Sequence, residues 1–540
     1  MFSMKRENLV DKNVLKKFGN EFSVDLEYFL EEMKKLSLEM GDFSLQKPFW
    51  ESNSIKFNVS QTPLNSREVY KNFNNFLSGC INWKSNQAQF NITPPSPHST
   101  IAAGAITSLL NPNAIWDVAC GKLANLEIYL SEYLASLCNW NKNPSGIFTF
   151  GGTGTNMYGL KIGINKCVKD FSEKGMPRNV YVISNDEGHS CHVTLCNWLG
   201  IRKKNCIRIK TSKFGSVEAD ALLKKVESLI KAGNKIACVI LNGGTNFNLV
   251  IDPIKKISLG LRCLSKKYNL DYVPHIHIDS VIGWVFLLFK DYNFKINRLN
   301  FPESVRNKLE VIYSQIKDIK YADSFGVDFH KTCFCPYSTS AFVLKNSGDW
   351  NYISPDKKVF IHQDFNHGGY KPGQYSLETS RPATGIVSAY ATLNTLGVDG
   401  ISSILANYLY ISEDLRSRIE RTDNLFNLNK DSNGWATFFS VTNRGDSFAS
   451  IYHNRNDSEV LSQNRVQKKF YSYLERKYYN KLPWFIGFNR CYKKNVNGCP
   501  ISCLKWYPMS PYLNIKSNQK FIRWIEKNYQ EFLRESKKES

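Results

Sequence analysis

The sequence has no apolar run long enough to cross a lipid bilayer. Its most apolar stretch, Val281 to Phe289, is far shorter than the roughly 18 residues that mark a candidate transmembrane helix. Residues 1–40 are charged and polar and lack the apolar segment of a signal peptide. The sequence therefore predicts a protein that does not contact membranes and resides in the cytoplasm.

Paired cysteine motifs of the zinc-binding kind are also missing. The chain has 14 cysteines, but Cys333 with Cys335, and Cys499 with Cys503, have no matching second pair at zinc-site spacing. No metal site is predicted. Without a signal peptide, the thiols are expected to be reduced.

Long basic blocks are absent, although the formal net charge is +22. The lysines are dispersed as isolated pairs, such as Lys203-Lys204 and Lys357-Lys358, and no nucleic-acid-binding fold signature accompanies them. Because nucleic-acid-binding domains gather basic residues on one face, this pattern favours a solvated surface. No nucleic-acid partner is predicted, and anionic substrates or simple solubility fit the charge equally well.

Short apolar runs alternate with helical patterns from residue 145 onward. Strands are predicted at Val180–Ser184, Ile236–Asn242 and His275–Asp279, and helices between them at Ala219–Ala232 and Ile254–Lys267. This alternation predicts an α/β fold with a mainly parallel central sheet and helices on both faces.

The pattern divides the chain into three units, which is reasonable for 540 residues. Residues 1–115 form a helical N-terminal segment, with helical spacing over 20–40 and 100–110. Residues 116–385 form the large α/β domain. Residues 386–540 form a smaller α+β domain, with helices predicted at 387–396, 401–420 and 520–533 and a strand at 435–441.

A glycine-rich turn, Gly151-Gly152-Thr153-Gly154-Thr155, follows an apolar run and precedes a helical pattern. Glycine lets backbone amides at a helix N-terminus approach an anion, so the turn indicates a phosphate site. Such turns are common, and this one lacks the lysine of a Walker loop. Downstream, His189 follows a predicted strand end, where an imidazole can stack on an aromatic cofactor or simply cap the surface.

Two further polar residues follow strands in the same segment. Asp279 ends an apolar strand, so its carboxylate is a candidate partner for a pyridinium nitrogen, or else a helix N-cap. Lys331 lies among aromatic residues, where lost hydration is expected to lower the pKa of its amine and make it a nucleophile; a surface lysine is the alternative. Turn, histidine, aspartate and lysine in this order indicate a site for pyridoxal phosphate (PLP), which needs an amine and an acid at opposite ends of its ring.

The sequence resembles the group II PLP-dependent amino-acid decarboxylases, the family of the glutamate, aromatic-amino-acid, diaminobutyrate and cysteine-sulfinate enzymes. The similarity runs over residues 90–400 and weakens toward the end of the chain. Five motifs carry it: Gly146–Tyr158, His189 with Leu199–Ile201, Gly244-Thr245 with Asp252–Ile254, His277–Asp279 and Ala322–Lys331.

The resemblance implies fold type I, the PLP-dependent transferase fold, and a homodimer whose active site is shared between subunits. It implies that Lys331 carries PLP as a Schiff base, that Asp279 pairs with the pyridine nitrogen and that His189 stacks on the ring. Further residues are implied around the coenzyme: Thr153, Gly154, Thr155 and Ser324 at the phosphate, Thr245 at the cofactor, and His330 beside the Schiff base.

Three positions depart from the family pattern. Asn246 replaces a usual threonine, and Val281 replaces a small residue near the ring. The third is Phe360, where the family usually has a loop tyrosine that protonates the α-carbon, and phenylalanine has no proton to donate. Tyr352 or His362 are the alternative donors.

Three functions remain open from the sequence. The first is decarboxylation of an L-amino acid to its amine. The second is decarboxylation coupled to oxidative deamination, which gives an aldehyde, as in relatives with a change like Phe360. The third is a PLP-binding protein without turnover. The amino-acid substrate is undetermined, and Lys505 is a candidate for a carboxylate-binding arginine of the family.

Overall fold

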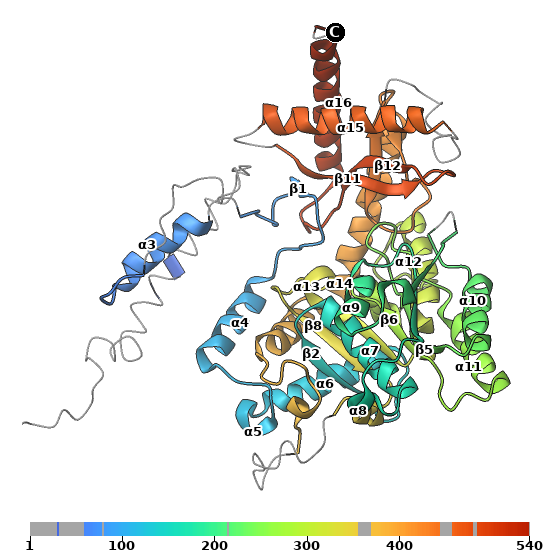
Figure 1. The fold of residues 1–540 in the computed structure, drawn as a ribbon. Helices are drawn as coiled ribbons and strands as arrows, with labels where there is room; N and C mark the ends of the chain where they lie inside the picture. The colour runs from blue at the N-terminus through green and yellow to red at the C-terminus, as the bar shows by residue number, and fades with distance from the viewer. Residues whose placement is uncertain are drawn as a thin grey trace, which may run out of the picture.

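The computed structural model describes residues 59–77, 80–212, 215–354, 369–442, 456–478 and 483–538, together with residues 27, 30 and 31. Two sheets organise these residues, a larger one in the middle of the chain and a smaller one toward the C-terminus (Figure 1). The predicted helix over 20–40 and the position Phe360 lie outside the described residues, apart from those three isolated positions.

The larger sheet has seven strands in the order β2-β8-β7-β6-β5-β3-β4. All neighbouring strands are parallel except β8, which is antiparallel to both β2 and β7. The strands are β2 (Ser145–Thr149), β3 (Val180–Asn185), β4 (Cys206–Ile209), β5 (Lys235–Asn242), β6 (His275–Asp279), β7 (Ser324–Asp328) and β8 (Ser340–Leu344).

Both faces of this sheet are buried, which explains the near-continuous apolar strands. In β5, Val239 and Leu241 pack into one apolar cluster and Cys238 and Ile240 into another, because successive side chains point to opposite faces. The flanking helices and turns are α6 (Leu123–Leu137), α7 (Gly152–Cys167), α8 (Phe171–Lys174), α9 (Cys191–Trp198), η2 (Lys203–Asn205), α10 (Ala219–Lys231), α11 (Ile254–Lys267), η3 (Gly283–Phe289), α12 (Glu303–Ile316), η4 (Lys317–Tyr321), α13 (Phe329–Thr332), η5 (Ser347–Tyr352) and η7 (Pro372–Gln374).

The smaller sheet has the order β1-β11-β12-β10-β9. Its strands are β9 (Leu425–Asn427), β10 (Thr437–Val441), β11 (Phe485–Lys494) and β12 (Pro500–Trp506), joined by β1 (Ala88–Gln89) from the N-terminal part. The helices α15 (Asp457–Lys477) and α16 (Ile515–Lys538) pack on it and bury a separate apolar cluster. This is the α+β unit at the top of Figure 1.

The long helix α14 (Thr384–Glu420) joins the two sheets, with a break at Gly397, whose φ of 63° suits glycine. It corresponds to the two helices predicted on either side of that residue. The remaining helices are α3 (Ser66–Leu77), α4 (His98–Leu110) and α5 (Asp117–Cys120). The predicted boundary at residue 386 falls in the first turn of α14, and the three-unit division remains a proposal.

The architecture confirms the predicted α/β fold with a mainly parallel sheet. Most predicted strands and helices lie within two residues of the observed bounds, and His275–Asp279 and Ile254–Lys267 match them. Among the described residues, no helix combines the length and apolarity that a membrane span requires.

Candidate functional site

A cavity of about 2350 Å³ opens at the carboxyl ends of β3, β5, β6 and β7 and extends to the smaller sheet. In α/β sheets this edge is where ligands bind. The cavity exceeds the roughly 300–1,000 Å³ of a typical small-molecule site. It therefore has room for a coenzyme and a substrate together.

The turn between β2 and α7 forms one wall. Gly151 has a φ of 126°, which only glycine adopts readily, and Gly151, Gly152 and Thr153 line the cavity. The first backbone N–H groups of α7 lack intrahelical partners and attract an anion at this end. This wall fits a phosphate group, as the sequence predicted for Thr153.

Two other predicted phosphate residues point elsewhere. Thr155 is fully buried; its hydroxyl donates to the Gly152 carbonyl at 2.8 Å, and its side chain packs over Gly326. Gly154 faces Thr149 and Phe150, which leave no space for a Cβ. Neither lines the cavity, so only their backbone positions in the first helical turn bear on the phosphate.

Ser324 also does not reach the cavity, which corrects its predicted role. It begins β7, whereas the cavity lies at the opposite end of that strand. Its hydroxyl is within 2.7 Å of His275 and 2.9 Å of His277, in the interior of the sheet. The motif Ala322–Lys331 drew attention to this serine, but the direction of the strand places it beneath the site.

Asp279 ends β6 on the floor of the cavity, with a side chain only 7% exposed. One carboxylate oxygen, Oδ2, accepts hydrogen bonds from His192 Nε2 at 3.0 Å and Asn156 Nδ2 at 3.1 Å. Burial alone would raise the pKa of Asp279, but the hydrogen bond from His192 and the charges of His192, Lys331 and His189 together outweigh burial, and the pKa is lowered. The floor therefore carries a fixed negative charge.

The second carboxylate oxygen, Oδ1, is buried and has no hydrogen-bond partner among the described residues. An unpaired buried carboxylate oxygen is costly. A protonated ring nitrogen arriving from the cavity would satisfy it. This single atom is the clearest sign that the floor is built for a group that the protein does not itself supply.

His192 was not identified from the sequence, although it lies in the predicted segment around His189. Its Nδ1 is 2.7 Å from Ser184 Oγ and its side chain is fully buried. Cys191, His192 and Asp279 bring ligand-type atoms within 4.8 Å of one another. Because His192 and Asp279 already bond each other, we assign this group to the floor of the cavity and not to a metal site.

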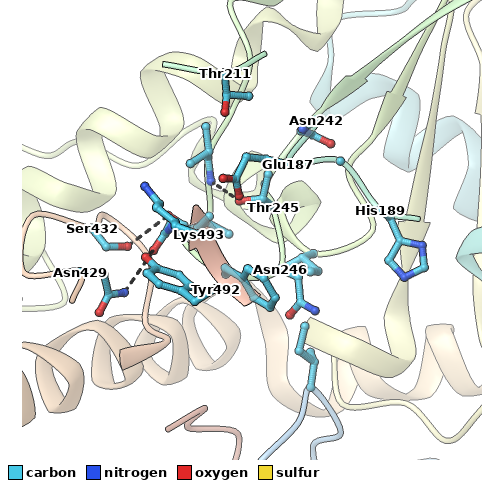
Figure 2. A pocket seen from close by; sticks show the side chains of 18 of the residues that line it. Glu187, His189, Thr211, Asn242, Thr245, Asn246, Asn429, Ser432, Tyr492 and Lys493 are labelled. Carbon is cyan, nitrogen blue, oxygen red and sulfur yellow. Dashed lines mark hydrogen bonds between the residues drawn. The ribbon is translucent and has the colours of Figure 1, made fainter. Parts of the chain in front are cut away.

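His189 lines the same cavity as Asp279, and its ring is labelled in Figure 2. Burial lowers the pKa of His189, with Asp279 acting in the opposite direction. Its Nδ1 accepts a hydrogen bond from the Cys191 backbone at 3.2 Å. A neutral imidazole held in this way can present a flat face to an aromatic ring, and stacking of His189 on the coenzyme stays a prediction.

Lys331 lies in α13, directly after β7, and lines the same cavity. Its Nζ is 2.7 Å from Oδ2 of Asp328, whose side chain is 1% exposed. Burial lowers the pKa of Lys331, but the charge and hydrogen bond of Asp328, together with Asp279 and Tyr337, outweigh burial, so the net pKa is raised. The expectation of a lowered lysine pKa is therefore wrong for the protein alone, because the sequence pattern gave no weight to this carboxylate.

His330 also lies on the cavity wall, with its ring centroid 4.0 Å from that of Tyr337. Burial lowers the pKa of His330. Tyr337 was not singled out from the sequence, although it brings a phenol hydroxyl to the side of the cavity that holds Lys331. The alternative donor Tyr352 lies outside the cavity lining, near Lys166 at the other end of α7, and His362 is outside the described residues.

Thr245 lines the cavity from the turn after β5. Its hydroxyl accepts a hydrogen bond from the Val250 backbone at 3.0 Å (Figure 2). Asn248, in the same turn, accepts hydrogen bonds from Asn429 and Tyr492 at 3.2 and 3.0 Å. This turn therefore connects the large sheet to the smaller one at the cavity.

The far part of the cavity carries charges of both signs. Glu187 and Lys493 face each other there (Figure 2). Burial raises the pKa of Glu187, and it lowers the pKa of Lys493. Lys505, the candidate for a carboxylate-binding group, does not line the cavity; it lies in β12, with its Nζ 5.9 Å from the Phe90 ring centre.

Comparison with known proteins agrees with this geometry. Residues 48–308 match the profile of the pyridoxal-dependent decarboxylase conserved domain, a span that includes His189 and Asp279 and ends before Lys331. Residues 48–308 belong to this family. The family's coenzyme, PLP, fits the cavity through the free oxygen of Asp279, the turn at Thr153, the ring of His189 and the amine of Lys331.

Among its relatives, the L-2,4-diaminobutyrate decarboxylase of Acinetobacter baumannii is 24% identical over 349 residues, which cover 62% of each chain. The acidic amino acid decarboxylase GADL1 of Bos taurus is 24% identical over 331 residues, covering 59% of this chain and 57% of that one. The alignments thus span less than two thirds of these relatives.

Solved structures show the same fold along almost the whole chain. The apo structure of mouse CSAD superposes with a TM-score of 0.76 at 14% identity and covers 94% of this chain and 99% of that one. The structure of Oryza sativa TDC with PLP and tryptamine gives 0.76 at 12% identity and covers 98% and 100%. Fold type I is therefore confirmed.

Proposed function

We propose that this protein removes the α-carboxyl group of an L-amino acid as carbon dioxide, with PLP as coenzyme, and releases the amine. The observation that carries the proposal is the pairing of two groups in one cavity. Asp279 offers a buried, unpaired carboxylate oxygen, and the Lys331 amine lies at the end of the adjacent strand. PLP, when bound, supplies a ring that takes up the electron pair left by the departing carbon dioxide.

The protein's own residues divide the remaining work. Lys331 Nζ is the proposed point of covalent attachment, and Asp279 keeps a proton on the ring nitrogen. His189 covers one ring face, and the turn at Gly151–Thr153 binds the phosphate. Thr245 lines the same cavity from the turn after β5 and is the proposed further contact to the coenzyme. Together these contacts fix the ring while the substrate reacts.

Proton delivery to the α-carbon decides which product forms. His330 and Tyr337 lie on the cavity wall with Lys331, and each can carry a proton. Phe360 occupies the position at which the family usually has a tyrosine. This departure favours a second candidate, the aldehyde-forming reaction. The structure of a Rhodiola rosea 4-hydroxyphenylacetaldehyde synthase shares the fold, with a TM-score of 0.73 at 12% identity.

A product assay distinguishes these functions. Purified protein is loaded with PLP and incubated with the standard amino acids, diaminobutyrate and cysteine sulfinate, and amine, aldehyde, peroxide and ammonia are measured. Carbon dioxide with a stoichiometric amine supports the proposal. Stoichiometric peroxide and aldehyde without amine would support the second candidate, and a bound coenzyme without any product would support a non-catalytic PLP-binding protein.

The attachment point has its own test. Borohydride reduction of the loaded protein, followed by peptide mass mapping, should place the coenzyme on Lys331. A tag on another lysine contradicts the proposed site whatever the product is.

We also propose a homodimer that shares the active site. The helix α4 leaves large apolar side chains in water, with Ile106 61% exposed, Leu109 58% and Leu110 73%. An exposed apolar face of this kind marks an interaction surface. The residues just before α4, Asn91 and Ile92, line the cavity, so a partner that covers this helix would lie close to the site.

A further inference from the structure

Asp328 is the one carboxylate that contacts the Lys331 amine among the described residues. It occupies the last position of β7, and its side chain is almost completely buried. Its Oδ1 accepts a hydrogen bond from Ser340 Oγ at 2.5 Å, and its Oδ2 lies 2.7 Å from Lys331 Nζ and 3.5 Å from His330 Nε2. Both oxygens therefore have fixed neighbours.

The same carboxylate reaches the phosphate-binding turn. A Cβ placed on Gly152 would come within 2.8 Å of Asp328 Oδ2, so the absence of a side chain at Gly152 leaves room for this oxygen. The N-terminal end of α7 begins at Gly152, and a helix N-terminus stabilises a nearby negative charge. Asp328 thus lies between the reactive amine and the anion-binding turn.

We propose that Asp328 is a positioning residue that acts as the counter-ion of the Lys331 nitrogen and holds it positively charged, both as the free amine and in its bond to the coenzyme. This inference rests on the proposed attachment at Lys331 and goes beyond it. A protonated linkage is the form that an incoming amino group attacks. Asp328 would therefore keep the loaded protein ready for substrate over a wider pH range.

The electrostatic surroundings of Lys331 single out Asp328 for this role. Asp279 is the second carboxylate that acts on Lys331, but its oxygens are directed to His192, Asn156 and the ring position. Burial opposes the charge of the amine, and Asp328 is the largest of the groups that favour it. The titratable groups that interact with Lys331 are Asp328, Asp279, Tyr337, His330, His189 and Cys191.

The test uses the full-length protein loaded with PLP and compares the wild type with Asp328→Asn, Ser340→Ala and Asp220→Asn. Asparagine keeps the size of Asp328 and can still accept from Ser340, but it removes the charge. Ser340→Ala removes the hydrogen bond and keeps the charge. Asp220 is an exposed aspartate paired with Lys256 and serves as the matched control. The readout is the pH midpoint at which the visible absorbance of the protonated linkage disappears.

The expected result is that Asp328→Asn lowers this midpoint by roughly one to three pH units, the range that a close opposite charge produces. Ser340→Ala and Asp220→Asn should keep the wild-type midpoint. A midpoint that is unchanged in Asp328→Asn, or that falls equally in Ser340→Ala, would overturn the proposal. So would tighter coenzyme binding in Asp328→Asn without a shift, because that would place the charge against the phosphate instead.

A second measurement needs no coenzyme. In the ligand-free protein, labelling of Lys331 by an amine-selective reagent should begin at lower pH in Asp328→Asn than in the wild type. Circular dichroism establishes that each variant is folded. Borohydride mapping in the wild type separates the two proposals. If the reduced coenzyme is found on another lysine, the proposed attachment at Lys331 is wrong. If it is found on Lys331 but the midpoint of Asp328→Asn is unshifted, only the proposed role of Asp328 is wrong.

Discussion

Replacing His192 by leucine should weaken coenzyme binding at low pH, although His192 has no proposed contact with the coenzyme. The imidazole donates to Asp279 Oδ2 at 3.0 Å, and both side chains are buried. A hydrogen bond to a charged group contributes about 1.5–3 kcal/mol. At about 1.36 kcal/mol per pKa unit, its loss should raise the pKa of Asp279 by roughly one to two units.

The sign of the pH effect follows from the direction of this shift. In the wild type, the pKa of Asp279 is lowered, so its carboxylate stays ionised at pH values below the pKa of an ordinary aspartate. In His192→Leu, protonation begins at higher pH, and a protonated Asp279 no longer holds the charge of the ring nitrogen. As the pH is lowered, PLP affinity should fall when Asp279 becomes protonated. The pH at which this fall occurs, the acid limb of the affinity profile, should therefore be about one to two units higher in His192→Leu than in the wild type.

The assay is an absorbance titration of the ligand-free protein with PLP at a series of pH values. Ser184→Ala is the matched variant, because it removes the bond to His192 Nδ1 at 2.7 Å and leaves the His192–Asp279 contact in place. Its acid limb should move less than that of His192→Leu. Circular dichroism establishes that both proteins are folded. If the wild type and His192→Leu then show the same pH dependence of PLP affinity, this account of the cavity floor is refuted.

Three further outcomes are expected. Lys331→Ala should abolish both borohydride trapping of PLP and product formation, as measured by mass mapping and carbon dioxide release, while thermal unfolding stays cooperative. Asp252→Asn should reduce the free energy of unfolding by roughly 1–3 kcal/mol, because the NH₂ of the new amide would face buried N–H donors that now bond both carboxylate oxygens. Urea titration measures this change, and the exposed control Asp220→Asn should have a free energy of unfolding within about 0.5 kcal/mol of the wild type. Leu110→Glu should shift a dimer to monomer in light scattering with size-exclusion chromatography, and a wild-type monomer would contradict the proposed assembly.

The arrangement of the large domain was predictable from the sequence because its strands are buried on both faces. The strands predicted at Ile236–Asn242 and His275–Asp279 lie within one residue of the observed β5 and β6. The rule that ligands bind at the carboxyl ends of parallel strands then brings His189 and Asp279 together. The antiparallel strand β8 was not predicted, since strand direction does not appear in a hydrophobic pattern.

Predictions for individual side chains were less accurate where a residue's partner lies far away in the sequence. Ser324 belongs to a motif that contains Lys331, but the intervening strand separates the two along its length. Thr155 belongs to the glycine-rich turn, but one helical turn directs its hydroxyl inward. Proximity in sequence is therefore a poor guide to which hydroxyl reaches a ligand.

The pKa of Lys331 was also mispredicted from the sequence, because the sequence pattern does not show which charged side chain contacts the amine. From the sequence, an amine among Phe325 and Phe329 is expected to lose hydration and become neutral. In the structure, the intervening Asp328 turns back toward the amine, because α13 starts directly after β7 and places residues three apart on one face. The charge of one carboxylate thus opposes the effect of burial on the amine. It follows that the same lysine needs its counter-ion neutralised or withdrawn before its free amine can react, so the loading of PLP should be faster in Asp328→Asn than in the wild type.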